Sequence, residues 1–246
     1  MKREIYKFPG IAELAAQLAA DFKAAAEEKA TAGERLIVAL SGGHTPKSFF
    51  EVLAQPPYRD SVPWDSVIFF WGDERCVPPD NDESNFKMTN LALLSHIPIP
   101  EPNVHRVLGE NPPEEEAARY AEVIRNFVPS AGNGFPRFDW IFLGMGDDGH
   151  TASLFPGAPT LQEKEKICVV ATHPQTGQKR VSVTFPVLDN GARVSFLVAG
   201  ADKEPVLRQI LEGEGQQLPY PSSMVNPVDG VLEWYVDSAA APWLSA

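Results

Sequence analysis

The chain has 246 residues, and its 21 Lys and Arg against 33 Asp and Glu give a formal net charge of -12. This charge makes nucleic acid and anionic membrane surfaces poor partners, and we expect neither. It is compatible with a small anionic ligand, because a few local cations and helix N-termini can hold one inside an acidic protein. The length and the 43% hydrophobic content suffice for one α/β domain or two smaller ones.

Helix-like and strand-like segments alternate along the chain. Apolar residues at helical spacing predict helices over residues 10–31, from Pro46 past Leu53, over 84–94 and 113–127, and around 206–211. Short apolar or β-branched runs predict strands at residues 35–40, 67–71, 138–143, 167–170, 180–185, 193–198 and 232–237. This alternation predicts an α/β fold, a mostly parallel sheet with helices on both faces. No repeat or linker divides the chain, so we expect one domain over residues 1–246.

A glycine turn with the sequence SGGHTP, residues 41–46, follows the first of these strands. Thr45 is the expected N-cap of the next helix and Pro46 its first residue. A strand, a glycine turn and a helix in this order form a cradle for an anion, since free N–H groups and the helix dipole both favour phosphate. A plain tight turn explains the two glycines equally well, and the pattern matches neither a P-loop nor a GxGxxG motif.

A second group of polar residues, GDERCVP at residues 72–78, leaves the strand at 67–71. Its Arg75 carries a planar guanidinium that suits an oxyanion, and Asp73 or Glu74 is placed to orient it; a structural ion pair is the alternative. Further cations near strand ends are Lys203 and the adjacent Lys179 and Arg180. If these strand ends face one pocket, the cations can hold an anionic ligand in an acidic protein.

The most informative stretch is GMGDDGHTASLFP, residues 144–156, directly after the strand at 138–143. Three glycines within six residues let the backbone turn sharply and approach a ligand. Asp148 lies two residues before His150, so the carboxylate can fix the tautomer of an imidazole that acts as a general base. A structural histidine is one alternative, and a metal site is another that lacks an evident third ligand. Thr151 and Ser153 are expected to cap a short helix.

The two cysteines and the first residues of the chain indicate the cellular compartment in which the protein is expected. Cys76 and Cys168 show neither CxxC spacing nor a histidine at a metal-ligand interval, so we interpret both as reduced thiols without a chemical role. The first residues lack the apolar stretch of a signal peptide, and no apolar run approaches the roughly 20 residues of a membrane span. We therefore expect a cytoplasmic protein.

In this combination and order, the motifs resemble the 6-phosphogluconolactonase family over nearly the whole chain. The matching segments are LSGGHTP at 40–46, WGDER at 71–75 with Ser84 and Asn85, residues 144–156, RVSVT at 180–184, GADK at 200–203, and residues 221–237. The fold that this resemblance implies is a modified Rossmann-like α/β sheet, shared with glucosamine-6-phosphate deaminase and related to ribose-5-phosphate isomerase.

The resemblance implies hydrolysis of 6-phospho-D-glucono-1,5-lactone to 6-phosphogluconate, the second step of the oxidative pentose phosphate pathway, without a metal or other cofactor. His150 would deprotonate the attacking water, and Asp148 would orient His150. The other implied contacts are to the substrate: Arg75, Arg180 and Lys203 to the phosphate, and Ser41, Gly42, Gly43 and Thr45 in the turn beside it. The family often has Ser or Arg where His44 stands, so we assign His44 no catalytic part, and Lys179 is a weaker candidate. The chain would act as a monomer or small homo-oligomer.

Two rival functions share the fold. A deaminase-like sugar-phosphate isomerase has the same Asp-Gly-His sequence but continues into Asn-Glu-Pro, whose Glu serves catalysis, whereas this chain continues as ASLFP at residues 152–156. A sugar-phosphate sensor without enzymatic activity would normally carry a basic helix-turn-helix segment, and none precedes the first predicted strand. Both comparisons favour the lactonase.

Overall fold

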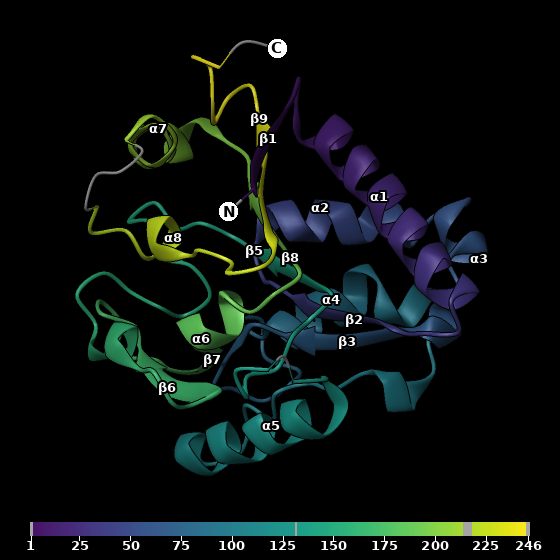
Figure 1. Cartoon of the computed structure of the whole chain (residues 1–246), viewed down its shortest axis with the longest axis horizontal. Coiled ribbons are helices and arrows are strands. Elements are labelled where there is room, and N and C mark those ends of the chain that lie inside the picture. Colours follow the sequence, from purple (N-terminus) through teal and green to yellow (C-terminus); the bar gives the residue numbers. More distant parts are fainter. Residues whose placement is uncertain (1, 131, 214–217, 245–246) are drawn as a thin grey trace.

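The computed structural model describes residues 2–130, 132–213 and 218–244 (Figure 1). Its central sheet has the strand order β1-β9-β8-β5-β2-β3, and every neighbouring pair is parallel. The strands are β1 (Lys2–Phe8), β2 (Leu36–Leu40), β3 (Val67–Trp71), β5 (Trp140–Leu143), β8 (Arg193–Val198) and β9 (Val231–Asp237). The predicted mostly parallel sheet is therefore confirmed. Strand β1 is an addition, because an edge strand rich in charge lacks the apolar run by which the others were predicted.

The helices lie in the order α1 (Ile11–Thr31), α2 (His44–Leu53), α3 (Tyr58–Ser61), α4 (Asn85–Ala92), α5 (Pro113–Phe127), α6 (Phe185–Leu188), α7 (Glu204–Glu212) and α8 (Pro221–Met224). Short 3-10 helices are η1 (Trp64–Ser66), η2 (Leu94–His96), η3 (Glu101–Asn103), η4 (Pro159–Gln162) and η5 (Ala201–Lys203). Ser84 caps α4 as predicted, because its hydroxyl accepts a hydrogen bond from the backbone N–H of Lys87 at 3.1 Å. None of the helices in the described ranges has the length and apolarity needed to span a membrane.

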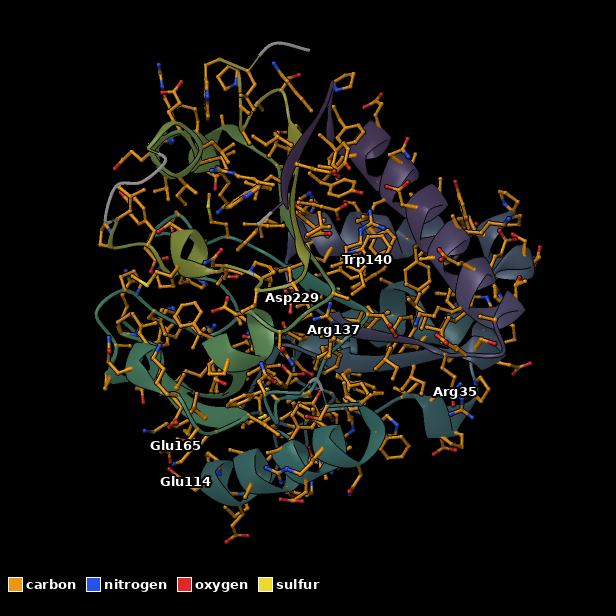
Figure 2. The ribbon with its side chains drawn as sticks, viewed as in Figure 1. Arg35, Glu114, Arg137, Trp140, Glu165 and Asp229 are labelled. Carbon is orange, nitrogen blue, oxygen red and sulfur yellow. The ribbon has the colours of Figure 1, made fainter. Side chains whose placement is uncertain are left out.

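Both faces of the sheet are covered, as predicted. Ile37 and Ala39 of β2 pack on the side of α5 and α7, whereas Val38 and Leu40 pack on the side of α1 and α2. This division follows from the period of two in a strand, and it explains why β2 is apolar along its whole length. Trp140, at the start of β5, is buried on the α1 and α2 side (Figure 2).

A second, antiparallel sheet with the order β4-β7-β6 lies beside the first. It consists of β4 (Asp73–Arg75), β6 (Cys168–Thr172) and β7 (Lys179–Val183). The segment that the sequence indicated as a polar strand end is thus itself a strand, and the stretches at 167–170 and 180–185 do not join the parallel sheet. A β-rich composition predicts a strand but does not identify its partner, since pairing is decided by contacts distant in sequence.

The order of the parallel strands reverses next to β2. From β2 the chain moves to β3 on one side, but β5 pairs with β2 on the other side and leads on to β8 and β9. The segments that leave β2 and β5 at their carboxyl ends therefore diverge and open a crevice, which is where ligands bind in open α/β sheets. Residues 41–45 follow β2 and residues 144–150 follow β5, so both predicted turns lie at this point.

Candidate active site

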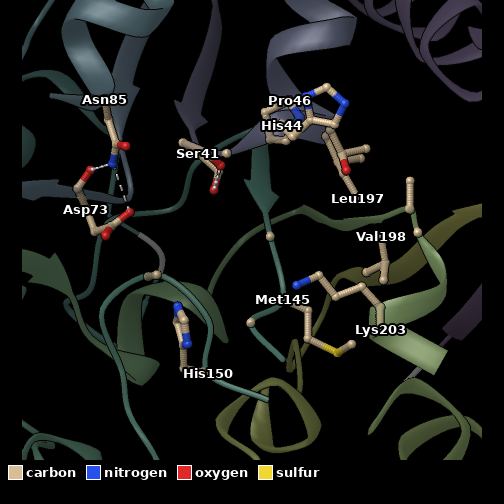
Figure 3. A pocket seen from close by; sticks show the side chains of 18 of the residues that line it. Ser41, His44, Pro46, Asp73, Asn85, Met145, His150, Leu197, Val198 and Lys203 are labelled. Atoms are coloured by element: carbon tan, nitrogen blue, oxygen red, sulfur yellow. Dashed lines mark hydrogen bonds between the residues drawn. The ribbon is translucent and has the colours of Figure 1, made fainter. Parts of the chain in front are cut away.

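A cavity of about 420 Å³ opens at this edge of the sheet, a volume typical of a small-molecule site (Figure 3). His150 and Lys203 point into it from opposite walls. The predicted site residues that line the cavity are Ser41, Gly42, Gly43, Thr45, Arg75, His150, Arg180 and Lys203. The remaining predicted residue, Asp148, contacts His150 instead of the cavity. The tertiary structure therefore brings the predicted residues to one place.

His150 and Asp148 form a hydrogen-bonded pair. Nδ1 of His150 lies 2.6 Å from Oδ1 of Asp148, and the backbone N–H of His150 donates to the same oxygen at 3.0 Å. Burial alone would raise the pKa of Asp148, but the hydrogen bonds and charge of His150 outweigh burial and hold that pKa below its usual value. Because an ionised carboxylate only accepts hydrogen bonds, the ring proton belongs on Nδ1, and Nε2 of the neutral imidazole is left as a base.

The turn that carries this pair is held by glycines and hydroxyl groups. A side chain on Gly146 would overlap the ring of His150, so the backbone can pass this close only as glycine. No helix begins at residues 151–153, and the next helical element is η4 at Pro159–Gln162, so the predicted capping role of Thr151 and Ser153 is wrong. Thr151 donates to the carbonyl oxygen of Gly144 at 2.9 Å, and Ser153 donates to Oδ2 of Asp73 at 2.6 Å. The Thr151 hydroxyl thus closes the turn on itself and the Ser153 hydroxyl fastens it to β4, so neither starts a helix.

Arg75 and Arg180 stand directly opposite each other on β4 and β7. Within the described residues neither forms a salt bridge: Nη1 of Arg75 donates to the carbonyl oxygen of Glu83 at 2.6 Å, and Nε of Arg180 donates to the side chain of Gln178 at 3.2 Å. Burial, and then the charge of Arg75, lower the pKa of Arg180. Two facing cations without carboxylate partners are unfavourable by themselves, and a bound anion would stabilise both.

The predicted role of Glu74 in orienting Arg75 is wrong, because its carboxylate does not contact the guanidinium. It accepts the hydroxyl of Ser84 at 3.0 Å. It also accepts three backbone N–H groups, from Arg75, Asn85 and Phe86. Burial raises the pKa of Glu74, and these backbone hydrogen bonds oppose the rise. Glu74 therefore ties the N-terminus of α4 to β4 and so supports the wall of the cavity.

The turn after β2 begins its helix two residues earlier than predicted. Gly43, not Thr45, is the N-cap of α2, and its φ of +107° is a conformation that favours glycine. Gly42 is required for a different reason, since a side chain there would overlap the carboxamide of Asn85. The first turn of the ten-residue helix α2 borders the same cavity as the three cations, which favours the anion cradle over a plain tight turn.

Asp73 and Asn85 also line the cavity. Asp73 was the other residue predicted to orient Arg75, but its described side-chain partners are Ser153 and Asn85. The side-chain amide of Asn85 donates to the backbone oxygen of Asp73 at 3.0 Å (Figure 3). His44 lines the cavity as well, whereas Lys179 lies outside it and donates to the hydroxyl of Thr172 at 2.9 Å. Contacts such as that of Asn85 with Gly42 join residues more than forty positions apart, so no local pattern reports them.

The other ionisable groups considered from the sequence do not form a reactive centre. Burial raises the pKa of the Cys76 thiol to about 11 and that of Cys168 further still, so both thiols are protonated at neutral pH. In the described part of the chain no three His, Cys, Asp or Glu side chains gather as metal ligands. The chemistry available in the cavity is thus that of a carboxylate-oriented imidazole beside anion-binding cations.

The fold and the site together define an α/β enzyme that acts on a small anionic substrate at the switch point of a parallel sheet. The chain belongs to the family of glucosamine-6-phosphate isomerases and 6-phosphogluconolactonases, whose model matches residues 9–234. It is 43% identical over 203 residues to a 6-phosphogluconolactonase of Haemophilus influenzae, covering 82% of this chain and 85% of that protein.

Two solved structures are similar to the whole fold. The crystal structure of devB protein superposes with a TM-score of 0.93 at 44% identity, over 99% of this chain and 100% of the other. The structure of 6-phosphogluconolactonase from Trypanosoma brucei superposes with a TM-score of 0.87 at 27% identity, over 99% of each chain. The predicted family and fold class are therefore confirmed.

Proposed function

We propose that this protein hydrolyses 6-phospho-D-glucono-1,5-lactone to 6-phospho-D-gluconate in the oxidative pentose phosphate pathway, with His150 as the general base. The observation that carries the proposal is the pairing of His150 with Asp148 on the wall of a cavity that also holds Arg75, Arg180 and Lys203. The cavity thus holds a base that can activate water and cations that can bind phosphate. The 6-phosphogluconolactonases among its relatives support the same substrate.

The reaction needs one base that later serves as an acid. Nε2 of neutral His150 removes a proton from water as the water oxygen attacks the lactone carbonyl carbon, which gives a tetrahedral alkoxide. The alkoxide collapses and breaks the bond between that carbon and the ring oxygen. The ring oxygen takes the proton back from His150, and the product is the open-chain acid, which ionises to its carboxylate. Asp148 stays ionised throughout and stabilises the imidazolium that exists between the two transfers.

The cations that line the cavity supply binding and orientation. Arg75 and Arg180 have guanidinium donors without carboxylate partners, and the ammonium of Lys203 contacts only the exposed carboxylate of Asp202, at 2.9 Å, among its described salt bridges. The N-terminus of α2 adds backbone N–H groups and the positive end of its dipole. These contacts hold the phosphate so that the lactone carbonyl lies near His150.

Location, assembly and domain organisation are part of the same proposal. Both cysteines are free thiols, which supports a reducing cytoplasm. One parallel sheet with apolar cores on both faces supports a single domain over residues 1–246, whose two terminal residues lie outside the described ranges. We propose a monomer or small homo-oligomer, which sedimentation would measure.

The direct test replaces His150 with Asn and measures lactone hydrolysis, with the spontaneous opening of the lactone subtracted. We expect kcat to fall by at least ~10²-fold, the lower end of general-base contributions, while the protein stays folded. His96→Asn is the matched control, because His96 is exposed and contacts only the carbonyl oxygen of Leu91 among its described hydrogen bonds. Near-normal turnover of the His150 variant would refute the assignment. Glucosamine 6-phosphate as substrate separates the lactonase from the deaminase-like alternative.

A further inference from the structure

The segment that begins α8 contacts the turn that carries His150. Ser222 is fully buried, and it donates two hydrogen bonds to the carbonyl oxygen of Gly149, from its hydroxyl at 2.8 Å and from its backbone N–H at 3.0 Å. Gly149 directly precedes His150, although Ser222 lies 73 positions away in the sequence. None of the roles described above uses this contact.

A single peptide group links these hydrogen bonds to the pair formed by Asp148 and His150. The peptide between Gly149 and His150 accepts both hydrogen bonds of Ser222 at its oxygen and donates its N–H to Oδ1 of Asp148 at 3.0 Å. That oxygen also lies 2.6 Å from Nδ1 of His150. Acceptance at the oxygen of a peptide polarises its N–H, so Ser222 strengthens the donor that orients Asp148.

The backbone at this point is shaped for a close approach. Gly149 has a φ of +78°, and a Cβ added to it would lie 2.5 Å from Cδ1 of Tyr220. The hydroxyl of Tyr220 donates to the side chain of Gln209 on α7 at 3.0 Å, and α7 follows Lys203 directly. The segment at residues 220–222 thus connects the turn of His150 to the helix next to a predicted phosphate-binding lysine.

We propose that Ser222 is a positioning residue, which holds the peptide between Gly149 and His150 so that Asp148 and His150 keep their mutual geometry for proton transfer. This inference rests on the proposed function of His150 as general base. It predicts an effect on the chemical step and on the carboxylate of Asp148, and none on phosphate binding, because Ser222 does not line the cavity.

The test compares Ser222→Ala with Ser223→Ala in the full chain. Ser223 is the matched control, since its hydroxyl donates to the carbonyl oxygen of Tyr220 at 2.7 Å in the same short helix and does not contact Gly149. We expect Ser222→Ala to lower kcat by about five- to tenfold, the scale of one lost hydrogen bond, with KM within about twofold. Ser223→Ala should leave both constants near those of the parent.

The pKa of Asp148 tests the contact independently of activity. It is measured in the substrate-free protein by following the ¹³C resonance of the Asp148 carboxyl as pH is varied. The titratable neighbours of this carboxyl are His150 on its own turn and His173 in the loop after β6, and Ser222→Ala changes neither. Because a weaker N–H donor stabilises the carboxylate less, we expect the pKa of Asp148 to rise in Ser222→Ala and to stay unchanged in Ser223→Ala.

A fall in kcat together with the higher pKa of Asp148 supports the proposal. An unchanged Asp148 titration overturns it, whatever happens to kcat, and so does an equal loss of kcat in both serine variants. If His150→Asn retained activity, the proposed role of His150 as general base would be refuted. The Asp148 titration would still decide separately whether Ser222 acts on this carboxylate.

Discussion

Replacing Arg75 with Ala tests how an acidic protein binds an acidic substrate. Arg75 faces Arg180 across the strand pair, and its described hydrogen bond from the guanidinium goes only to the carbonyl oxygen of Glu83. Removing it leaves no carboxylate unpaired, so we expect the free protein to stay within about 1 kcal/mol of the parent in stability, the scale of one exposed hydrogen bond. A charge-assisted contact to phosphate contributes ~1.5–3 kcal/mol, which corresponds to a loss in kcat/KM of roughly 10- to 150-fold.

The assay measures initial rates with 6-phospho-D-glucono-1,5-lactone and with unphosphorylated glucono-1,5-lactone. We expect the loss on the phosphorylated substrate, mostly as a higher KM, and little difference on the other. Arg75→Lys should recover only part, because an ammonium cannot make a bidentate contact. Arg59→Ala removes the same charge from α3, where Arg59 pairs with Asp60, and controls for long-range attraction.

Two results would refute this reasoning about Arg75. An equal loss on both lactones would mean that Arg75 supports the fold or the reaction centre, and the phosphate would then have to bind around Arg180 and Lys203. A similar loss in Arg59→Ala would mean that net charge, and not a local contact, sets the affinity for the substrate.

Two further predictions concern metal dependence and pH. Activity should survive extensive chelation and dialysis, and a loss reversed only by a divalent cation would contradict the metal-free mechanism. Burial raises the pKa of Asp189 to about 6, so the folded state binds a proton more tightly than the unfolded chain, and this group lowers stability as pH rises from about 4 to 6. At pH 7 the free energy of unfolding of Asp189→Asn, measured by denaturant titration, should therefore exceed that of the parent by about 1–3 kcal/mol. Below pH 4 the two proteins should have equal free energies of unfolding. A difference of the same size at both pH values would contradict this explanation.

Much of the site could be predicted from the sequence because its chemistry is carried by neighbouring residues. Asp148 and His150 are two positions apart, the SGGHTP turn leads directly from a strand into a helix, and Ser84 caps the helix that follows it. The placement of both turns at the carboxyl ends of parallel strands also follows from local alternation of strands and helices. These features depend on spacing along a few residues, which the sequence displays.

The tertiary structure decided which distant segments meet. The sequence predicted strands at 167–170 and 180–185, but only the fold shows that β7 lies between β4 and β6 in a separate sheet, which sets Arg180 opposite Arg75. The expected helix after His150 was wrong because the Ser153 hydroxyl donates to Asp73, 80 positions away, and the Thr151 hydroxyl donates to Gly144 within the turn. Hydrogen bonds between residues far apart in the chain, such as those from Ser222 to Gly149, form only after packing has brought the partners together, and no local pattern encodes them.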